Sequence, residues 1–154
     1  MNVRLTSSSR RVLLAMAVAF ILPGRAFSKS SPNDQERSDV KIKLTFGEHT
    51  TMATLYDNPS ARDFASMLPL DLKIVDFGSN EKIAYLPRKL TVEGHGPFDN
   101  ERPYDLCYYI PWGNLAMFYA DYRHPGLIRL GRFDEGYEAL HIPGEFSLRI
   151  ERVQ

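Results

Sequence analysis

Large apolar residues alternate with polar ones over several short segments of this chain, and this alternation limits the folds open to it more than any other feature. The clearest example is VKIKLTF at 40–46, in which every second residue is large and apolar, and FSLRI at 146–150 repeats the pattern. Successive side chains of a β-strand point to opposite faces of the sheet. A period of two therefore predicts strands with one face in a core and the other toward water.

The remaining strand candidates lie between turn-forming residues, and two of them, 106–110 and 114–119, are mostly apolar without alternation. Such a run is typical of a strand that is covered on both faces. About eight short strands predict a closed barrel or a sandwich, and closure would leave no exposed sheet edge. The expected fold class is mainly β, with one short helix. The expected strands are 40–46, 50–56, 70–76, 82–86, 106–110, 114–119, 127–133 and 146–150.

One helix is expected directly after the second strand. Asn58 can cap its first turn, and Pro59 suits the first helical position because the N–H that proline lacks has no helical partner there. Pro69 disfavours helical geometry at the residue before it, so the helix should end by Leu68. Its apolar stripe, at the spacing i, i+3, i+4 and i+7, consists of Ala61, Phe64, Ala65 and Leu68.

The N-terminal segment has the three parts of a secretory signal. Arginines precede an uninterrupted apolar run from Val12 to Leu22, and small residues at positions 26 and 28 offer a cleavage site. The run is shorter than the roughly 20 residues that a membrane-spanning helix needs. We therefore expect residues 1–28 to be a signal peptide that is cleaved after Ser28. The mature protein should be periplasmic or secreted, with no stable membrane anchor after cleavage.

Two export routes fit this segment equally well, because Arg10 and Arg11 resemble a paired-arginine signal and also suit an ordinary basic start. Residues 29–39 are polar and contain no large apolar side chain, which predicts a flexible linker. The 126 residues after the signal are too few for two ordinary domains. We therefore expect one domain at 40–153.

The charge balance and the histidines exclude some partners. The first 28 residues hold four arginines and no acidic residue, which leaves 15 basic and 19 acidic groups in the rest of the chain. Nucleic-acid-binding proteins normally show a basic excess or a basic patch, so no nucleic-acid partner is expected. The four histidines lie far apart and lack the spacing of metal ligands. Neither a metal nor a cofactor is expected.

Three further features bear on a site. The single cysteine, Cys107, lies in an apolar run and is expected to be a buried hydrophobic residue. The segment from Thr91 to Tyr104 is long for a compact domain, and both a binding loop and a plain surface insertion fit it. The only tryptophan, Trp112, lies in a turn between two apolar strands, where it can either cap the fold or line a pocket.

Five short motifs occur in the chain, namely ATLYDNP at 53–59, ARDF at 61–64, LPRKL at 86–90, YIPWGNLA at 109–116 and GLIRLG at 126–131. Together and in this order they resemble the bacterial cyclophilin-like domain family. The resemblance extends over essentially the whole expected domain. It implies a closed cyclophilin-like β-barrel of eight strands with few helices, a fold that the strand pattern allows but does not select.

The resemblance also implies candidate site residues. Prolyl isomerases of this fold carry F-H-R-[VI]-I, whose arginine holds the prolyl peptide, and segment 85–90 keeps Arg88 without the Phe-His pair. Their S-Q-F-F strand corresponds to LAMF at 115–118, which keeps one phenylalanine and lacks the glutamine. Arg88 is thereby the catalytic candidate. The ligand-binding candidates are Phe118, Trp112, His124 and Met117.

These observations lead to three hypotheses. The first is an exported barrel that binds a peptide segment or a small molecule without efficient catalysis. The second is a weak peptidyl-prolyl cis-trans isomerase that uses a remnant groove through Arg88. The third is a purely structural domain, in which Tyr108, Tyr109 or Tyr122 fills the groove.

Overall fold

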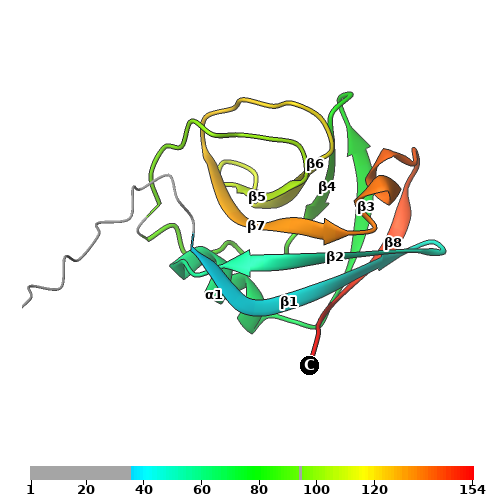
Figure 1. Cartoon of the computed structure of the whole chain (residues 1–154), viewed down its shortest axis with the longest axis horizontal. Coiled ribbons are helices and arrows are strands. Elements are labelled where there is room, and N and C mark those ends of the chain that lie inside the picture. Colours follow the sequence, from blue (N-terminus) through cyan, green and yellow to red (C-terminus); the bar gives the residue numbers. More distant parts are fainter. Residues whose placement is uncertain (1–35, 94) are drawn as a thin grey trace, which may run out of the picture.

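The strands close into an antiparallel barrel in the order β1-β2-β7-β5-β6-β4-β3-β8, as the computed structural model of the chain shows (Figure 1). It describes residues 36–93 and 95–154, so the expected signal peptide and most of the expected linker lie outside the described residues. The expectation of a mainly β, closed barrel of about eight strands with one short α-helix is confirmed. The elements are β1 (Arg37–Phe46), β2 (His49–Tyr56), α1 (Pro59–Ser66), β3 (Leu70–Phe77), β4 (Glu81–Tyr85), β5 (Asp105–Tyr109), β6 (Asn114–Phe118), β7 (Leu127–Glu135), the 3-10 helix η1 (Tyr137–His141) and β8 (Phe146–Arg152).

The first strand begins earlier than the alternation predicts. β1 starts at Arg37 rather than Val40, so the last three residues of the expected linker belong to the barrel. Arg37 pairs with Tyr56 of β2, and the Ser38 hydroxyl donates to the Leu55 carbonyl at 2.9 Å. Hydrogen bonds therefore attach residues 37–39 to β2. These residues are polar and show no alternation of apolar and polar side chains, so the sequence pattern does not predict them as a strand.

The alternating strands place their large apolar residues inside the barrel. Ile42, Leu44 and Phe46 of β1 are at most 1% exposed, and Leu148 and Ile150 of the paired strand β8 are buried beside them. The residues between them lie at least partly in solvent. This interior is the main source of stability, because each fully buried large apolar side chain contributes about 1.5–3 kcal/mol relative to exposure.

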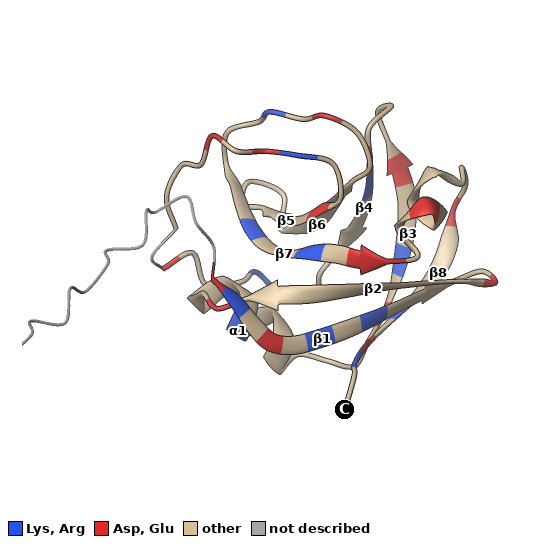
Figure 2. Ribbon diagram, viewed as in Figure 1, with Lys and Arg blue, Asp and Glu red and all other residues tan. Residues whose placement is uncertain are grey.

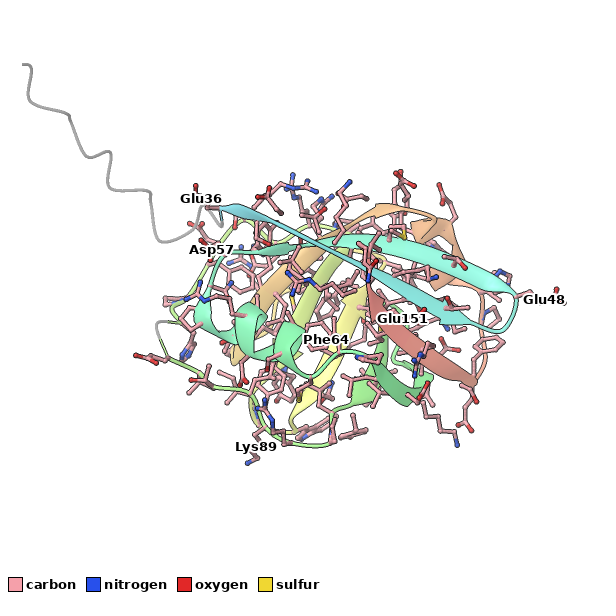
Figure 3. The ribbon with its side chains drawn as sticks, turned by 90° about the horizontal axis from the view of Figure 1, so that it is seen from below. Glu36, Glu48, Asp57, Phe64, Lys89 and Glu151 are labelled. Atoms are coloured by element: carbon pink, nitrogen blue, oxygen red, sulfur yellow. The ribbon has the colours of Figure 1, made fainter. Side chains whose placement is uncertain are left out.

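Helix α1 packs against the barrel interior through Phe64. Asn58 caps it as expected, since its side chain accepts a hydrogen bond from the Ala61 N–H at 2.9 Å. Phe64 is fully buried in the core cluster and lies toward the middle of the molecule, whereas Asp57 and Lys89 lie at its periphery (Figure 3). No helix in the described part of the chain is long and apolar enough to cross a membrane.

The short helix η1 has no counterpart among the expected elements. It follows Gly136, which has a φ of +65° and lies so close to β2 that a Cβ atom there would be 2.3 Å from the Thr50 carbonyl oxygen. Glycine is therefore required for both its conformation and its contact. Five residues are too few to show a helical period in the sequence.

Strands β5 and β6 are covered on both faces, which explains their apolar composition. Leu106, Leu115 and Met117 belong to the barrel interior, whereas Cys107 and Ala116 form a second cluster on the opposite, outer face. The segments 95–104 and 119–126 run as two wide arches beside these strands (Figure 1). From these segments, Phe98 and Tyr122 join Phe118 of β6 in the outer cluster.

A buried carboxylate ties these two segments to the barrel. Asp105 of β5 is fully buried and accepts hydrogen bonds from the Tyr122 hydroxyl at 2.8 Å and from Arg132 at 3.0 Å. Arg129 lies 3.5 Å from the same carboxylate and donates to Asn100 at 2.7 Å. Pairing of this kind compensates for the loss of water around a buried charge. The loops are thereby held at fixed positions over the outer face.

The surface charges are mixed in sign. Figure 2 shows basic and acidic residues interspersed over the strands and loops. Several form pairs across neighbouring strands, such as Lys43 with Glu151 at 3.5 Å and Arg149 with Asp71 at 2.6 Å. Exposed ion pairs contribute about 0–1 kcal/mol each, so the surface adds little to the stability of the core.

Candidate ligand-binding site

A cavity of about 280 Å³ opens on the outer face of the barrel, between strands β4 and β6 and the segment 119–126. This volume is close to the lower end of the about 300–1,000 Å³ that is usual for ligand sites. We call it the outer-face pocket. Its aromatic walls are Phe77, Tyr109, Trp112, Phe118 and Tyr122, and its polar lining includes Glu81, Asn114, Arg123 and His124.

The strand register brings the lining of the outer-face pocket together from distant parts of the chain. Glu81 of β4 pairs with Phe77 of β3 on one side and with Phe118 of β6 on the other. Asn114 pairs with Tyr109 of β5 in the same way. Directly opposed residues in a sheet hold their Cβ atoms about 4.5–5.5 Å apart on one face. These side chains therefore form a continuous surface without any closeness in sequence.

Trp112 stands at the mouth of the outer-face pocket. It is 50% exposed, and its ring makes edge contacts with Phe77 and Tyr109, each with centroids 5.4 Å apart. Tyr109 in turn contacts the His124 ring at 5.1 Å. The four rings form a row along one side of the opening, so the tryptophan lines a pocket, one of the two roles that its turn position allowed.

Tyr122 occupies one side of the outer-face pocket. Its ring stacks on Phe118 with centroids 3.7 Å apart and planes 6° apart. In a purely structural domain, side chains such as Tyr122 would fill the whole outer-face pocket. Here Tyr122 fills only part of it, and the cavity beside the stacked pair stays open.

Asn114 gives the outer-face pocket a buried polar atom without a partner. The residue is 2% exposed, and its side-chain N–H donates to the Leu115 carbonyl at 3.0 Å. Within the described residues its Oδ1 atom has no hydrogen-bond partner. The Leu115 carbonyl can only accept, so it fixes the amide orientation and leaves the oxygen as the free atom. A buried acceptor without a donor costs about 1–3 kcal/mol, which a ligand donor would recover.

Glu81 adds a carboxyl group beside this acceptor. Burial raises the pKa of the Glu81 carboxyl above its ordinary value, and the nearby His124 partly offsets the effect. Within residues 36–93 and 95–154 the carboxylate forms no ion pair or hydrogen bond. An opposite charge from a ligand would therefore be favourable at this position.

The segment 119–126 supplies the remaining polar groups of the pocket. The Nδ1 atom of His124 lies 2.7 Å from the Pro125 carbonyl, to which it donates, so in the neutral ring Nε2 is the acceptor. Arg123 is 75% exposed, and its guanidinium lies 3.6 Å from the Glu101 carboxylate. Its charge is therefore partly balanced outside the cavity.

Three of the four ligand-binding candidates lie together in the outer-face pocket, namely Phe118, Trp112 and His124. Met117 does not, since it is fully buried in the barrel interior. The physical reason is the period of the strand. Neighbouring residues on β6 point to opposite faces, so Phe118 and Met117 cannot both reach the pocket.

Arg88 lies outside this pocket as well. Its guanidinium donates to both carboxylate oxygens of Asp63 on α1, at 2.7 and 3.1 Å. The same carboxylate accepts from the Thr91 N–H at 2.8 Å, and these hydrogen bonds, led by that of Arg88, hold the pKa of Asp63 below its ordinary value. Arg88 thus fastens the segment after β4 to the helix, and it is not among the pocket-lining residues.

The cysteine has the environment of a packing residue. Cys107 is fully buried on the outer face of β5, and burial raises the pKa of its thiol well above the ordinary range. A thiol with a raised pKa is a poor nucleophile. Among the described residues no three side chains of His, Cys, Asp or Glu are arranged to hold a metal ion.

The two lining residues with an unpartnered acceptor, Glu81 and Asn114, are not among the candidates derived from the sequence. The sequence does contain a hint of the role of Asn114. It is the only polar residue of the apolar strand β6, and it lies on the same face as Phe118. The signal for Glu81 is weaker, because an acidic residue at the end of a strand is common on any surface. Only the register of β4 between β3 and β6 places it beside two phenylalanines.

Comparison with known proteins supports the fold and the family. The solution structure of a hypothetical protein from Archaeoglobus fulgidus superimposes with a TM-score of 0.62 at 17% identity, covering 74% of this chain and 95% of that one. At this identity the likeness concerns the fold alone. A search of curated proteins found no match. The cyclophilin-like family matches residues 44–151, which is most of the chain and nearly all of the barrel, and the protein therefore belongs to the cyclophilin-like family.

Proposed function

We propose that this protein is a binding module that holds a small ligand or a peptide segment in the outer-face pocket. The observation that carries the proposal is the unpartnered Oδ1 atom of Asn114, buried beside an open cavity with aromatic walls. Buried polar atoms in folded proteins nearly always have a partner. A ligand that supplies the missing donor explains both the cavity and the acceptor.

The proposal includes the absence of efficient prolyl isomerisation. Rotation about an X–Pro bond is faster when a donor reaches the prolyl nitrogen in the transition state, which is differential binding. Arg88 is held by Asp63, and Arg123 is mostly in solvent beside Glu101. The Glu81 carboxylate and the Asn114 oxygen accept hydrogen bonds, so neither can donate to the prolyl nitrogen.

The proposal also includes export. The basic start and the apolar run before residue 23 support cleavage after Ser28 and a mature N-terminus at Lys29. The working compartment is then the periplasm or the exterior, and the ligand would be one that is available there. Mass spectrometry of the protein from its host tests this part, and an intact start at Met1 would contradict it.

The experiment for binding uses the single tryptophan as a reporter. Because Trp112 stands half-exposed at the pocket mouth, a ligand that enters should shift its fluorescence to shorter wavelength. Small-molecule fragments and short peptides are titrated against the wild type and against Asn114→Leu, with a melting curve to verify folding. The expected result is saturable binding that the variant weakens by about tenfold, the equivalent of one lost hydrogen bond. Emission that never changes across the set would contradict the proposal.

A further inference from the structure

Two polar groups of the outer-face pocket accept hydrogen bonds and have no hydrogen-bond partner among the described residues. They are the Oδ1 atom of Asn114 and the carboxylate of Glu81. Each can bind an N–H or O–H group of a ligand, and neither can bind a second acceptor. The pocket is therefore complementary to a ligand that is rich in donors.

Several donors around the same pocket are already engaged. The Asn114 amide donates to Leu115, and the Asn80 amide donates to the Asp121 carbonyl at 3.2 Å. The Tyr122 hydroxyl donates to Asp105 at 2.8 Å. Arg123 faces Glu101 and solvent. A ligand carboxylate or phosphate would also lie near the Glu81 carboxylate, which has no ion-pair partner among the described residues and repels a negative charge.

The walls favour a cation for a second, independent reason. Trp112, Tyr109 and Phe118 present aromatic rings to the cavity, and the negative face of such a ring attracts a positive charge. Glu81 lies between Phe77 and Phe118 in the strand register, so a charge placed there would be screened less than at an open surface.

We propose that the outer-face pocket binds an organic cation that carries N–H donors, an ammonium or guanidinium group on a short apolar or aromatic body. The proposal rests on the proposed function and names the ligand class. The positive group contacts the Glu81 carboxylate and the Asn114 oxygen, while the apolar body lies against Trp112 and Phe118. A cavity of about 280 Å³ admits one compact group of this kind.

The titration of Glu81 sets the pH dependence, and the basic side chains near it come from one segment. From the segment 119–126, His124 acts on the Glu81 carboxyl electrostatically, and Arg123 lines the same cavity. The raised pKa of Glu81 means that the proton competes with the cation at pH values above the ordinary range of a glutamic acid. Binding should therefore weaken as the pH falls.

The test compares three probes of similar shape, namely benzylammonium, benzyl alcohol and benzoate. The fluorescence of Trp112 and the NMR signal of its indole N–H report binding to the full chain. We expect benzylammonium to bind at least about tenfold more tightly than benzyl alcohol, as a charge-assisted hydrogen bond allows, and benzoate to bind most weakly. Equal or tighter binding of benzyl alcohol or benzoate would overturn the cation proposal and leave the binding function intact. No binding of any probe class would contradict both.

Two variants and one pH series sharpen the test. Glu81→Gln keeps the shape and removes the charge, and it should reduce the affinity for benzylammonium about tenfold while leaving benzyl alcohol unchanged. Glu48→Gln makes the same chemical change at the tip of the β1–β2 hairpin (Figure 3), at a residue that does not line the pocket, and should change nothing. Wild-type affinity for benzylammonium should fall as the pH is lowered, and the fall should begin above the ordinary titration range of a glutamic acid. Affinity that is independent of both Glu81 and pH would overturn the proposal.

A second pair of probes identifies the source of the cation. Benzylammonium represents a free amine, and N-acetyl-lysine N-methylamide represents a lysine side chain of a peptide. Tighter binding of the peptide-like probe supports the cation proposal with a peptide ligand, and tighter binding of the free amine supports it with a small molecule. If neither exceeds benzyl alcohol, the cation proposal is wrong.

Discussion

The ring of Tyr122 lies flat on the ring of Phe118, with centroids 3.7 Å apart and planes 6° apart. Phe118 ends strand β6, whereas Tyr122 belongs to the segment 119–126 that leads to β7. The hydroxyl of the tyrosine reaches further to the buried carboxylate of Asp105 at 2.8 Å. One side chain thus fixes a wall of the outer-face pocket to both its neighbouring strand and the buried charge network.

Replacing the tyrosine tests the hydrogen bond in this arrangement. Tyr122→Phe keeps the stacked ring but removes the donor to Asp105, leaving a buried carboxylate with one donor fewer. We expect a loss of about 1–3 kcal/mol in the free energy of unfolding, measured by chemical denaturation. Tyr85→Phe is the matched control, because Tyr85 is 55% exposed, and it should change stability by less than about 0.5 kcal/mol. Equal effects of the two variants would contradict the role of the Tyr122 hydroxyl.

The packing of helix α1 rests on one aromatic side chain. Phe64 is fully buried in the core cluster, so Phe64→Ala should lower the free energy of unfolding by about 3–5 kcal/mol. Phe77→Ala makes the same change at a side chain that is 43% exposed and should cost clearly less. A melting temperature of Phe64→Ala within error of the wild type would show that the helix does not depend on this contact.

Arg88 should govern stability against acid rather than ligand binding. Its hydrogen bonds hold the pKa of Asp63 low in the folded protein, so this carboxylate contributes stability above its unfolded pKa and loses it as the pH falls through the folded value. Arg88→Ala should therefore destabilise the protein at neutral pH, and the difference from wild type should shrink toward about pH 2. Unfolding curves at several pH values measure this. A difference that grows in acid would contradict the assignment, as would weaker ligand binding by the folded variant.

Prolyl isomerisation should run close to the uncatalysed rate. Displacement of a positioning group can alone cost about a hundredfold in rate, and here the candidate arginine is ion-paired away from the pocket. NMR exchange spectroscopy on a proline-containing peptide, without a coupled protease, measures the rate directly. Strong acceleration would make the protein an enzyme. Its persistence in Arg88→Ala would place the reaction at another residue, with Arg123 of the outer-face pocket the first to replace.

The local pattern of the sequence accounts for most of the fold. Each of the eight expected strands is present, and the capping by Asn58 follows from its side chain and the proline beside it. Closure of the barrel and the order of its strands depend on pairings between distant segments, such as β1 with β8. Alternation reports which residues share a face of one strand. It carries no information on which strands are neighbours.

The pocket could be predicted only in part for the same reason. Trp112, Phe118 and His124 were candidates because their motifs resemble those of a family, and the barrel brings them to one cavity. The resemblance makes Met117 a candidate together with Phe118. Adjacent residues of a strand point to opposite faces, however, and Met117 points into the core. Glu81 became a pocket residue only through its register with Phe77 and Phe118, and register is a property of the folded sheet.

The central claim is that the outer-face pocket is where this protein binds its ligand, and a two-dimensional NMR map of a bound probe tests it most directly. Benzylammonium or any fragment that binds is added to the isotopically labelled protein, and the backbone amides and the single indole N–H are followed. We predict saturable shifts concentrated at Glu81, Trp112, Asn114, Phe118 and His124, with little change at Glu48 and Phe64. Shifts confined to other surfaces, or no saturable shift with any ligand, would contradict the account.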